Sequence, residues 1–357
     1  MRSLHRVIPV ALLAVTLLVV PAHAWIRSPA TTFATLPDGA TPPEGITVDA
    51  KGNVYVTTFG FPASGESKEP GQLIVFDRHG QLVRQVTITG ASPHLLGLAF
   101  HPATGELLVL DFGAHQVLSV DPVSGSSSVF ATMPANAGIN ALTFDSAGKV
   151  YVSDSFLGVI WRTNPDGSGL TPWVTDTTTL ATSGIPPFGA NGLAFNTAQT
   201  ALFVANTGSD WVVKIPVTTG GSGLVPGTPA VFVNSINGAD GLVVDDEDNI
   251  WVCANQADEI VVIDKTGRVI AKLGDFDGID RHGRPIGLLF PASLAFSGDS
   301  LYVTNLTLDL RLFGLPQAVD SQWTTEVTKY TVARIHARIP PVHGHHRSGH
   351  CCERDED

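Results

Sequence analysis

Six residues at a regular spacing along the chain carry the clearest chemical signal in the sequence. They are separated by 52, 44, 51, 49 and 52 residues: Glu44, Leu96, Asn140, Asn191, Asp240 and Ala292. Four of the six have side-chain oxygen donors, two of them carboxylates, and none is His or Cys. Such a donor set suits Ca²⁺, Mg²⁺ or Mn²⁺ better than Zn²⁺. We therefore predict a divalent cation, Ca²⁺ first with Mg²⁺, Mn²⁺ or Zn²⁺ as alternatives, bound by Glu44, Asn140, Asn191 and Asp240.

A second interpretation of these four residues is purely structural. Asn and Asp at the start of a strand often cap a turn or bond to neighbouring backbone. Turns do not favour glutamate, however, and the four oxygen donors share one repeat position. The pattern therefore favours a single cation site over four independent turns.

The six positions belong to six copies of one longer pattern. Each copy has a short apolar alternation, a polar turn and a second alternation, as in PEGITVDAKGNVYVTT from Pro43 and ADGLVVDDEDNIWVCAN from Ala239. This pattern is typical of a β-hairpin. Further candidate strands lie between the hairpins, such as QLIVFDRHG followed by QLVRQVTIT. Six units of about 50 residues with four strands each predict an all-β fold, a six-bladed β-propeller over residues 25–338. A parallel α/β sheet is disfavoured because no segment shows a 3.6-residue period.

The two ends of the propeller predict how its ring closes. Residues 32–37, TFATLP, resemble residues 129–134, VFATMP, which fit an outer strand of the second unit. Residues 326–334, EVTKYTVAR, supply a third strand to the last unit. One blade built from the N- and C-terminal strands would hide sheet edges that are otherwise exposed. The first strand of each blade lines the channel of a propeller, so the six regularly spaced residues would surround one end of it.

The second strand of each hairpin returns another polar residue to the same end of the channel. These residues are Thr58, Asp111, Asp154, Asn206, Asn255 and Asn305. They either support the cation ligands or satisfy the ends of the hairpins. His94 and His115, near the second blade, are candidate proton carriers at neutral pH, with a structural role as the alternative.

Four longer insertions fall on the same face of the predicted propeller. They cover residues 60–71, 176–189, 275–290 and 306–325. Loops in this position often cover a binding site, and the segments GIPPFG and LRLFGLP would supply apolar walls. The alternative is that they are variable surface loops.

The composition limits the class of partner. The chain has 357 residues, 36 Gly, 24 Pro, 43% apolar residues and a net charge of −12. This apolar fraction suits a folded protein, and the many Gly and Pro residues suit a fold with many turns. An acidic surface repels phosphate backbones, so nucleic-acid binding is disfavoured. We expect a monomer that binds a small molecule.

Residues 1–24 have the features of a signal peptide. Arg2 and Arg6 precede an apolar run of about 14 residues, and Ala22-His23-Ala24 forms a small-x-small cleavage site. The run is short for a membrane span. The mature chain, from Trp25, would then be exported to the periplasm or the extracellular space and would have no membrane span. An uncleaved N-terminal anchor is the alternative.

The C-terminal segment differs in composition from the repeats. Residues 339–357, IPPVHGHHRSGHCCERDED, predict a disordered tail rich in His and Cys. The tail could bind a transition metal, but it lacks the second spaced Cys pair of a structural zinc site. Cys253, in the strand-like run IWVCAN, is expected to be a small buried hydrophobic residue.

Several of the quoted segments carry a resemblance to a known family. PEG, the hairpin that begins at Ile139, ANGLAF and ADGLVVDD resemble the gluconolactonase and regucalcin (senescence marker protein) family over residues 30–335. That family belongs to a superfamily of six-bladed, calcium-dependent lactonases and phosphotriesterases. The resemblance implies that Glu44, Asn140, Asn191 and Asp240 bind a catalytic divalent cation.

The combined signals predict a secreted, divalent-metal-dependent hydrolase of lactones or related esters. In this prediction Asp240 is both a cation ligand and the catalytic general base or nucleophile-activating group. The main alternative is a non-catalytic propeller that binds a ligand or a protein and holds a structural cation. A phosphotriesterase-like activity on the same cation is a third possibility.

Overall fold

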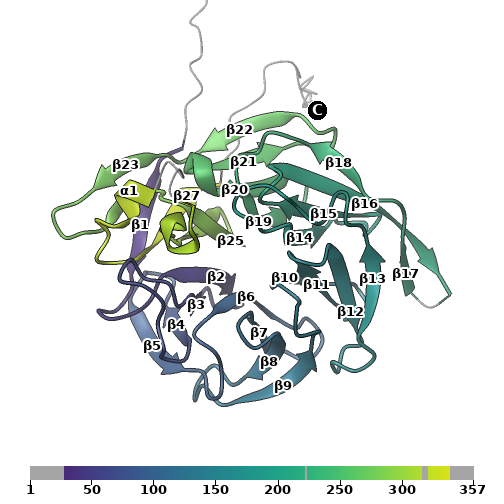
Figure 1. The fold of residues 1–357 in the computed structure, drawn as a ribbon, viewed down its shortest axis with the longest axis horizontal. Coiled ribbons are helices and arrows are strands. Elements are labelled where there is room, and N and C mark those ends of the chain that lie inside the picture. The colour runs from purple at the N-terminus through teal and green to yellow at the C-terminus, as the bar shows by residue number, and fades with distance from the viewer. Residues whose placement is uncertain (1–27, 222, 316–320, 338–357) are drawn as a thin grey trace, which may run out of the picture.

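The alternating segments form strands in the computed structural model, which describes residues 28–221, 223–315 and 321–337. Six sheets lie around a central channel, and each contributes its first strand to the channel wall (Figure 1). This arrangement confirms the predicted six-bladed β-propeller. The predicted signal peptide at residues 1–24 and the predicted tail at residues 339–357 lie outside the described residues.

Each of the first three blades is an antiparallel sheet of four strands in chain order. Blade 1 consists of β2 (Pro43–Val48), β3 (Val54–Thr58), β4 (Gln72–Phe76) and β5 (Leu82–Thr87). Blade 2 consists of β6 (Leu95–Phe100), β7 (Leu107–Asp111), β8 (Gln116–Val120) and β9 (Ser127–Thr132). Blade 3 consists of β10 (Ile139–Phe144), β11 (Val150–Asp154), β12 (Val159–Thr163) and β13 (Thr171–Thr175).

Blades 4 and 5 repeat this order. Blade 4 consists of β14 (Ala190–Phe195), β15 (Ala201–Asn206), β16 (Trp211–Gly220) and β18 (Ala230–Val233). Blade 5 consists of β19 (Ala239–Val244), β20 (Ile250–Ala254), β21 (Glu259–Ile263) and β22 (Val269–Leu273). A short 3₁₀ turn, η1 (Asn255–Ala257), follows β20.

Blade 6 closes the ring with strands from both ends of the chain. It consists of β25 (Pro291–Ser297), β26 (Ser300–Asn305), β27 (Thr331–His336) and β1 (Ala30–Thr35). The first strand of the chain pairs antiparallel with the last, and the two lie side by side in Figure 1. The predicted closure by terminal strands is confirmed. A hydroxyl also joins blade 6 to blade 1, because Thr304 Oγ1 donates to the carbonyl of Glu44 at 2.6 Å.

The core lies between neighbouring blades. The second strands of blades 1 to 5 are buried along their whole length, because a neighbouring sheet covers each of their faces. This two-sided burial explains why their sequences are nearly continuous apolar runs. Cys253 in β20 is fully buried among such residues, as predicted.

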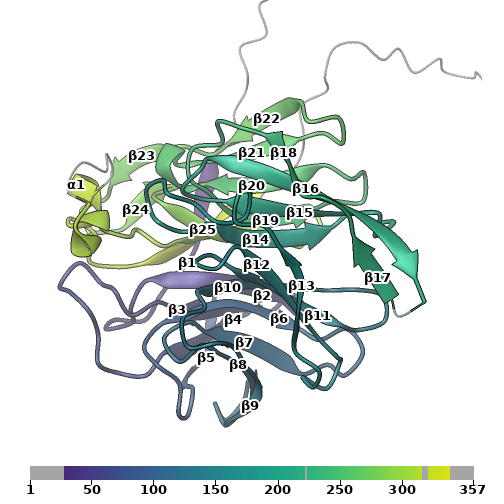
Figure 2. The same ribbon diagram turned by 45° about the vertical axis from the view of Figure 1, so that its right-hand side comes forward.

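Two insertions form hairpins that the sequence does not predict. Strand β16 runs on beyond its blade and pairs with β17 (Gly223–Pro226), and this hairpin projects from the ring in Figure 2. The insertion at residues 275–290 contains β23 (Phe276–Ile279) and β24 (Pro285–Gly287). No helix in the described ranges combines the length and the apolar character that crossing a bilayer requires.

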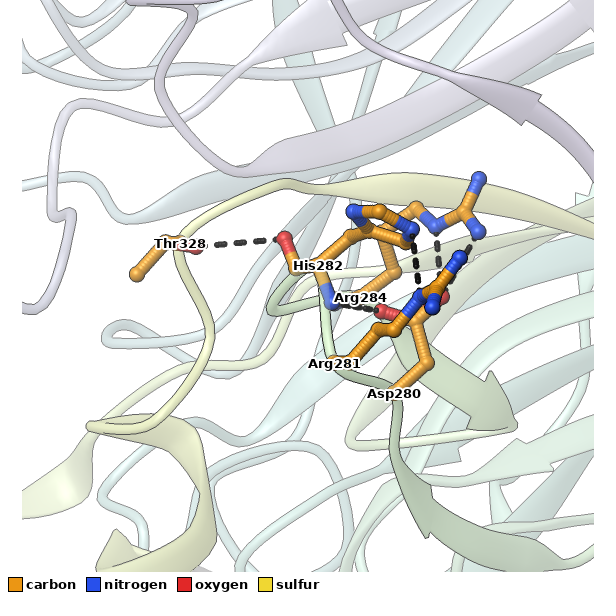
Figure 3. Close-up of polar contacts among 5 residues, drawn as sticks. All are labelled: Asp280, Arg281, His282, Arg284 and Thr328. Carbon is orange, nitrogen blue, oxygen red and sulfur yellow. Dashed lines mark hydrogen bonds and ion pairs between the residues drawn. The ribbon is translucent and has the colours of Figure 1, made fainter.

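A carboxylate organises the turn between β23 and β24. Asp280 accepts a hydrogen bond from the backbone nitrogen of His282 at 2.8 Å and forms an ion pair with Arg284 at 2.6 Å (Figure 3). The helical turn α1 (Ser321–Thr324) lies beside this hairpin, with Trp323 6.5 Å from Phe276 between ring centroids. A second 3₁₀ turn, η2 (Leu310–Phe313), precedes it in the chain.

Candidate metal centre

A β-bulge sets the position of each of the six regularly spaced residues, which we call the ring residues. In blade 1, Pro43 pairs with Thr58 and Ile46 pairs with Val56, so two residues of β2 face one residue of β3. The same register shift recurs at the start of β6, β10, β14, β19 and β25. Bulges re-aim side chains beside functional sites. The first residue in each bulge is a ring residue: Glu44, Leu96, Asn140, Asn191, Asp240 or Ala292.

Glycine follows four of the six ring residues, Glu44, Leu96, Asn191 and Asp240, and lets neighbouring blades approach closely there. Gly192 follows Asn191, and a Cβ atom on Gly192 would lie 2.5 Å from the carbonyl oxygen of Asp240 in the next blade. A Cβ atom on Gly241 would overlap the carbonyl oxygen of Ala292 in the same way. Only glycine allows this approach of one backbone to another. The inner strands, and with them the ring residues, are therefore drawn together around the channel.

Two carboxylates are buried at this end of the channel. Glu44 is 4% exposed and Asp240 is 5% exposed, and Oε2 of Glu44 is buried without a hydrogen-bond partner. Burial raises the pKa of Glu44 well above its usual value, and the charge of Asp240 raises it further. Burial also raises the pKa of Asp240, to about 7. A divalent cation would offset both charges and give the unpartnered oxygen a ligand bond, so the residues fit the predicted metal.

Amide side chains fix the orientation of Asp240. Asn255 Nδ2 donates to Asp240 Oδ2 at 2.8 Å, and the side chains of Asn255 and Asn191 both act to lower the pKa of this carboxyl against the effect of burial. Asn191 Nδ2 also donates to Thr207 Oγ1 at 3.0 Å, while Thr207 donates to the carbonyl of Ala239 at 2.8 Å. These hydrogen bonds hold an ionised Asp240 in place, because hydrogen bonds to a carboxylate favour its charged form.

The four predicted ligands line one cavity of about 40 Å³: Glu44, Asn140, Asn191 and Asp240. This volume accommodates a single ion, since one water molecule occupies about 30 Å³ of liquid. The other two ring residues, Leu96 and Ala292, are buried in an apolar cluster. Within the described part of the chain, no three His, Cys, Asp or Glu side chains form a cluster. The site instead combines two carboxylates with two amides, a donor set made of oxygen.

The polar residues at the ends of the second strands have two different roles: one supports a predicted cation ligand, and the others satisfy the ends of the hairpins. Asn255 contacts a predicted ligand directly. The others stabilise hairpin ends and loops: Thr58, Asp111, Asp154, Asn206 and Asn305. Thr207 also lines the cavity, and the sequence did not single it out. Its signal in the sequence is its place directly after Asn206, and the strand pairing makes it the equivalent of Asn255, because Asn206 pairs with Ala190 as Ala254 pairs with Ala239.

The two candidate histidines differ in their surroundings. The ring of His94 is half-buried, stacks on Phe61 with 4.5 Å between centroids and lies beside the cavity mouth. His115 makes a hydrogen bond from Nδ1 to the carbonyl of Ala137 at 2.7 Å, which fits the structural alternative. Of the two histidines, therefore, only His94 lies within reach of a ligand at this end of the channel.

The sequence matches a known family over more than half of its length. Residues 91–274 match the family model described as the SMP-30/gluconolactonase/LRE-like region, and this range contains Asn140, Asn191 and Asp240. A stretch of 143 residues is 24% identical to lactonase drp35 of Staphylococcus epidermidis and covers 38% of this chain. The match spans about two fifths, 41%, of the length of that lactonase.

Solved structures show the same fold. A gluconolactonase from Xanthomonas campestris is 15% identical, with a TM-score of 0.59, and the similarity covers 89% of this chain and 99% of that one. Regucalcin from Agrobacterium tumefaciens, described as a calcium-binding protein, is 18% identical, with a TM-score of 0.57 and coverage of 88% and 99%. With the family model matched across blades 2 to 5 and the same six-bladed ring around it, this chain belongs to the SMP-30/gluconolactonase/LRE-like family.

Proposed function

We propose that the protein is a divalent-metal-dependent hydrolase of lactones or related esters. The observation that carries the proposal is the buried pair Glu44 and Asp240, which share one cavity. No Lys, Arg or His is among the described residues that line this cavity, so the negative charge there is left for a cation. The similarity to a lactonase and a gluconolactonase supports the proposed hydrolysis of lactones. The similarity to a regucalcin described as calcium-binding supports the proposed cation.

Four residues of the chain would hold the cation, for which Ca²⁺ is the first candidate: Glu44, Asn140, Asn191 and Asp240. When bound, the cation polarises the ester carbonyl and stabilises the negative charge that develops on the carbonyl oxygen. Glu44 anchors the site through its buried carboxylate. The amides of Asn140 and Asn191 complete the donor set without adding charge.

Asp240 would also act as the general base. Its carboxylate accepts a proton from a water molecule, and the water oxygen forms a bond to the carbonyl carbon of the substrate. The bond between that carbon and the ester oxygen then breaks. The proton passes from Asp240 to the departing oxygen, so that a lactone yields one hydroxy acid. Asn255, at 2.8 Å from Oδ2, keeps the carboxylate oriented through these steps.

A panel of lactones and esters tests the proposal. We expect hydrolysis in the presence of Ca²⁺ or Mn²⁺, loss of turnover with EDTA and recovery when the cation is restored. Turnover that EDTA does not change would contradict metal dependence. Cation binding without turnover of any panel member would instead support a non-catalytic binding propeller.

We expect Ca²⁺ to stabilise the protein strongly at pH 8 and weakly at pH 5. Folding raises the pKa values of Glu44 and Asp240, so their contribution to stability is fully present below about pH 4 and is lost as the pH rises through the raised pKa of each group, which is about 7 for Asp240. Ca²⁺ binds the ionised carboxylates and offsets this loss, whereas protons displace it at low pH. Thermal unfolding with Ca²⁺ or EDTA at several pH values measures the effect. An equal shift in Tm at pH 5 and pH 8 would contradict it.

We also propose that the protein is exported after removal of residues 1–24. The support is the basic start, the apolar run and the Ala22-His23-Ala24 site in the sequence. N-terminal sequencing of protein secreted by a suitable host is expected to begin at Trp25. Recovery of the protein with Met1 intact and attached to membranes would favour the uncleaved anchor.

A further inference from the structure

A second cavity, of about 300 Å³, adjoins the metal centre. We call it the aromatic vestibule, after the six rings that bound it: Phe59, Phe61, Phe112, Phe156, Phe188 and Phe313. Phe59, Phe112 and Phe188, together with Pro186, line the metal cavity as well. The two cavities therefore share a wall of four residues. If the carbonyl group of a substrate lies at the four oxygen donors, the rest of the substrate can extend into the vestibule.

The rings of the vestibule form a continuous series of aromatic contacts. Successive centroids lie 4.8, 5.0, 6.4, 6.2 and 5.7 Å apart in the order Phe313, Phe61, Phe59, Phe112, Phe188 and Phe156. Such distances are those of edge-to-face and offset aromatic pairs. The wall is thus a connected aromatic surface rather than a scatter of single exposed rings.

Three of the four predicted insertions supply this wall. Phe61 belongs to residues 60–71, Phe188 to GIPPFG and Phe313 to LRLFGLP, which confirms the apolar walls expected from the last two segments. The loops are held in place by polar contacts at their bases. The carbonyl of Phe188 accepts a hydrogen bond from the backbone nitrogen of Gly208 at 2.8 Å, and the carbonyl of Phe290 accepts one from the backbone nitrogen of Leu306 at 3.1 Å. The vestibule is therefore pre-formed without a ligand.

The vestibule offers very few hydrogen-bonding groups. His94 is the one residue with a polar side chain among the described residues that line it. Its ring lies nearly parallel to that of Phe61, with 14° between the planes, and Nε2 lies 3.5 Å from Glu66. Burial lowers the pKa of His94 despite the opposing charge of Glu66, so the ring is neutral near pH 7. His94 thus adds one more uncharged ring to the wall.

We propose that the vestibule binds an apolar substituent of the substrate, an alkyl chain or an aromatic ring carried by the lactone or ester. This inference rests on the proposed hydrolase function. On entering the vestibule, the hydroxyl groups of a sugar lactone would lose their hydrogen bonds to water and would find no new partners. This loss disfavours the binding of sugar lactones. A volume of about 300 Å³ is at the small end of ligand pockets, which suits one ring or a short chain. The substrate preference of this chain therefore differs from that of an enzyme for polyhydroxylated lactones.

A homologous series of substrates tests the inference. We expect kcat/KM for γ-alkyl butyrolactones, assayed with Ca²⁺, to rise about fourfold for each methylene from methyl to hexyl. Gluconolactone should be hydrolysed at least 100-fold less efficiently than the hexyl compound. A flat series, or a preference for gluconolactone, would overturn the inference while leaving the hydrolase function in place.

Substitutions in the wall of the vestibule test whether the preference for long alkyl chains arises there. Phe313→Ala, which changes a ring that lines the vestibule but not the metal cavity, should lower kcat/KM for the hexyl lactone about 10-fold or more and leave the methyl lactone within twofold. Phe130→Ala, a half-buried ring on the outer strand β9, is the matched control and should leave the slope of the series unchanged. Phe156 is 45% exposed, so Phe156→Ala provides a second variant with little risk to folding. An equal loss for short and long substrates in both wall variants would contradict the assignment.

Calorimetric binding separates failure of this inference from failure of the proposed function. If no lactone or ester is hydrolysed, the hydrolase proposal fails, but binding of the hexyl lactone can still be measured. Binding that strengthens with chain length and weakens in Phe313→Ala would support the vestibule as an apolar binding site. Absence of both hydrolysis and binding would overturn the two proposals together.

Discussion

Asp240→Asn is expected to reduce kcat/KM for lactone hydrolysis at least 100-fold and, at the same time, to stabilise the metal-free protein. The loss of activity follows because the variant loses both a charged cation ligand and the proposed general base, and a general base alone contributes about 10²–10⁴-fold. The Asn255 hydrogen bond to this side chain can persist, since an amide oxygen is also an acceptor. The change is therefore mainly one of charge.

The gain in stability follows from burial of two like charges. At pH 8 both carboxyls are forced toward ionisation in a site that raises their pKa values, and each pKa unit corresponds to about 1.4 kcal/mol. Removal of one charge should raise the free energy of unfolding of the metal-free protein by a few kcal/mol in order of magnitude. Added Ca²⁺ should no longer raise Tm. Activity and stability then change in opposite directions.

The matched control is Asp246→Asn, the same chemical change at an exposed turn residue of the same blade. It should leave kcat/KM, metal-free stability and the response to Ca²⁺ unchanged. Differential scanning calorimetry with EDTA or Ca²⁺, together with the lactone assay, measures all three quantities. An Asp240→Asn protein that is less stable without metal, or that keeps its Ca²⁺ response, would refute the assignment of Asp240 as a buried cation ligand.

Gly192→Ala is expected to destabilise the protein by about 3 kcal/mol, near the upper end of overpacking effects, and to weaken Ca²⁺ binding. The new Cβ atom would lie 2.5 Å from the carbonyl oxygen of Asp240 and would overlap the backbone nitrogen of Leu242. Backbone atoms cannot rotate away as the end of a side chain can. The blade that carries Asp240 must therefore move, and the cation ligand must move with it.

Two comparisons make this prediction specific. Gly221→Ala is the control, because a Cβ atom there meets nothing within 4 Å and Gly221 lies in an exposed turn. In blade 3 the equivalent of Gly192 is Ala141, so the expected effect belongs to the contact between blades 4 and 5 and not to this repeat position in general. Thermal unfolding should show a decrease in Tm of roughly 5–10 °C for Gly192→Ala. A change as small as that of Gly221→Ala would show that the blades separate without cost.

Repeat position was sufficient to predict the ring, because equivalent residues of a closed repeat must lie around one axis. Glu44 and Asp240 are far apart in the chain, yet each is the first bulge residue of its blade, and both line the same cavity. The alternation of the strands and the terminal segments likewise predicted the closure of blade 6. These features depend on the backbone pattern, which the sequence repeats six times.

Side-chain partners could not be predicted in the same way. Asn255 and Asn305 look equivalent in the sequence, but β20 ends with Ala254 opposite Ala239, whereas Asn305 itself lies opposite Pro291, so Asn255 lies one position further along. From that position Asn255 donates to Asp240, whereas Asn305 donates to the carbonyl of Gly287, and the one-residue shift is visible only in the strand pairing. The shared wall between the metal cavity and the vestibule was equally hidden, because its rings come from loops whose conformations have no repeat.

The closure of the ring links the cation site to the order in which the chain is made. Thr304 in blade 6 donates to the backbone carbonyl of Glu44 across 260 residues of sequence. A nascent chain lacks this contact until β26 has left the ribosome, and blade 6 stays incomplete until β27 pairs with β1. Contacts of such long range form late in folding. A cation at the proposed site would therefore be acquired only after β27 has paired with β1, so its binding would report that blade 6 is complete.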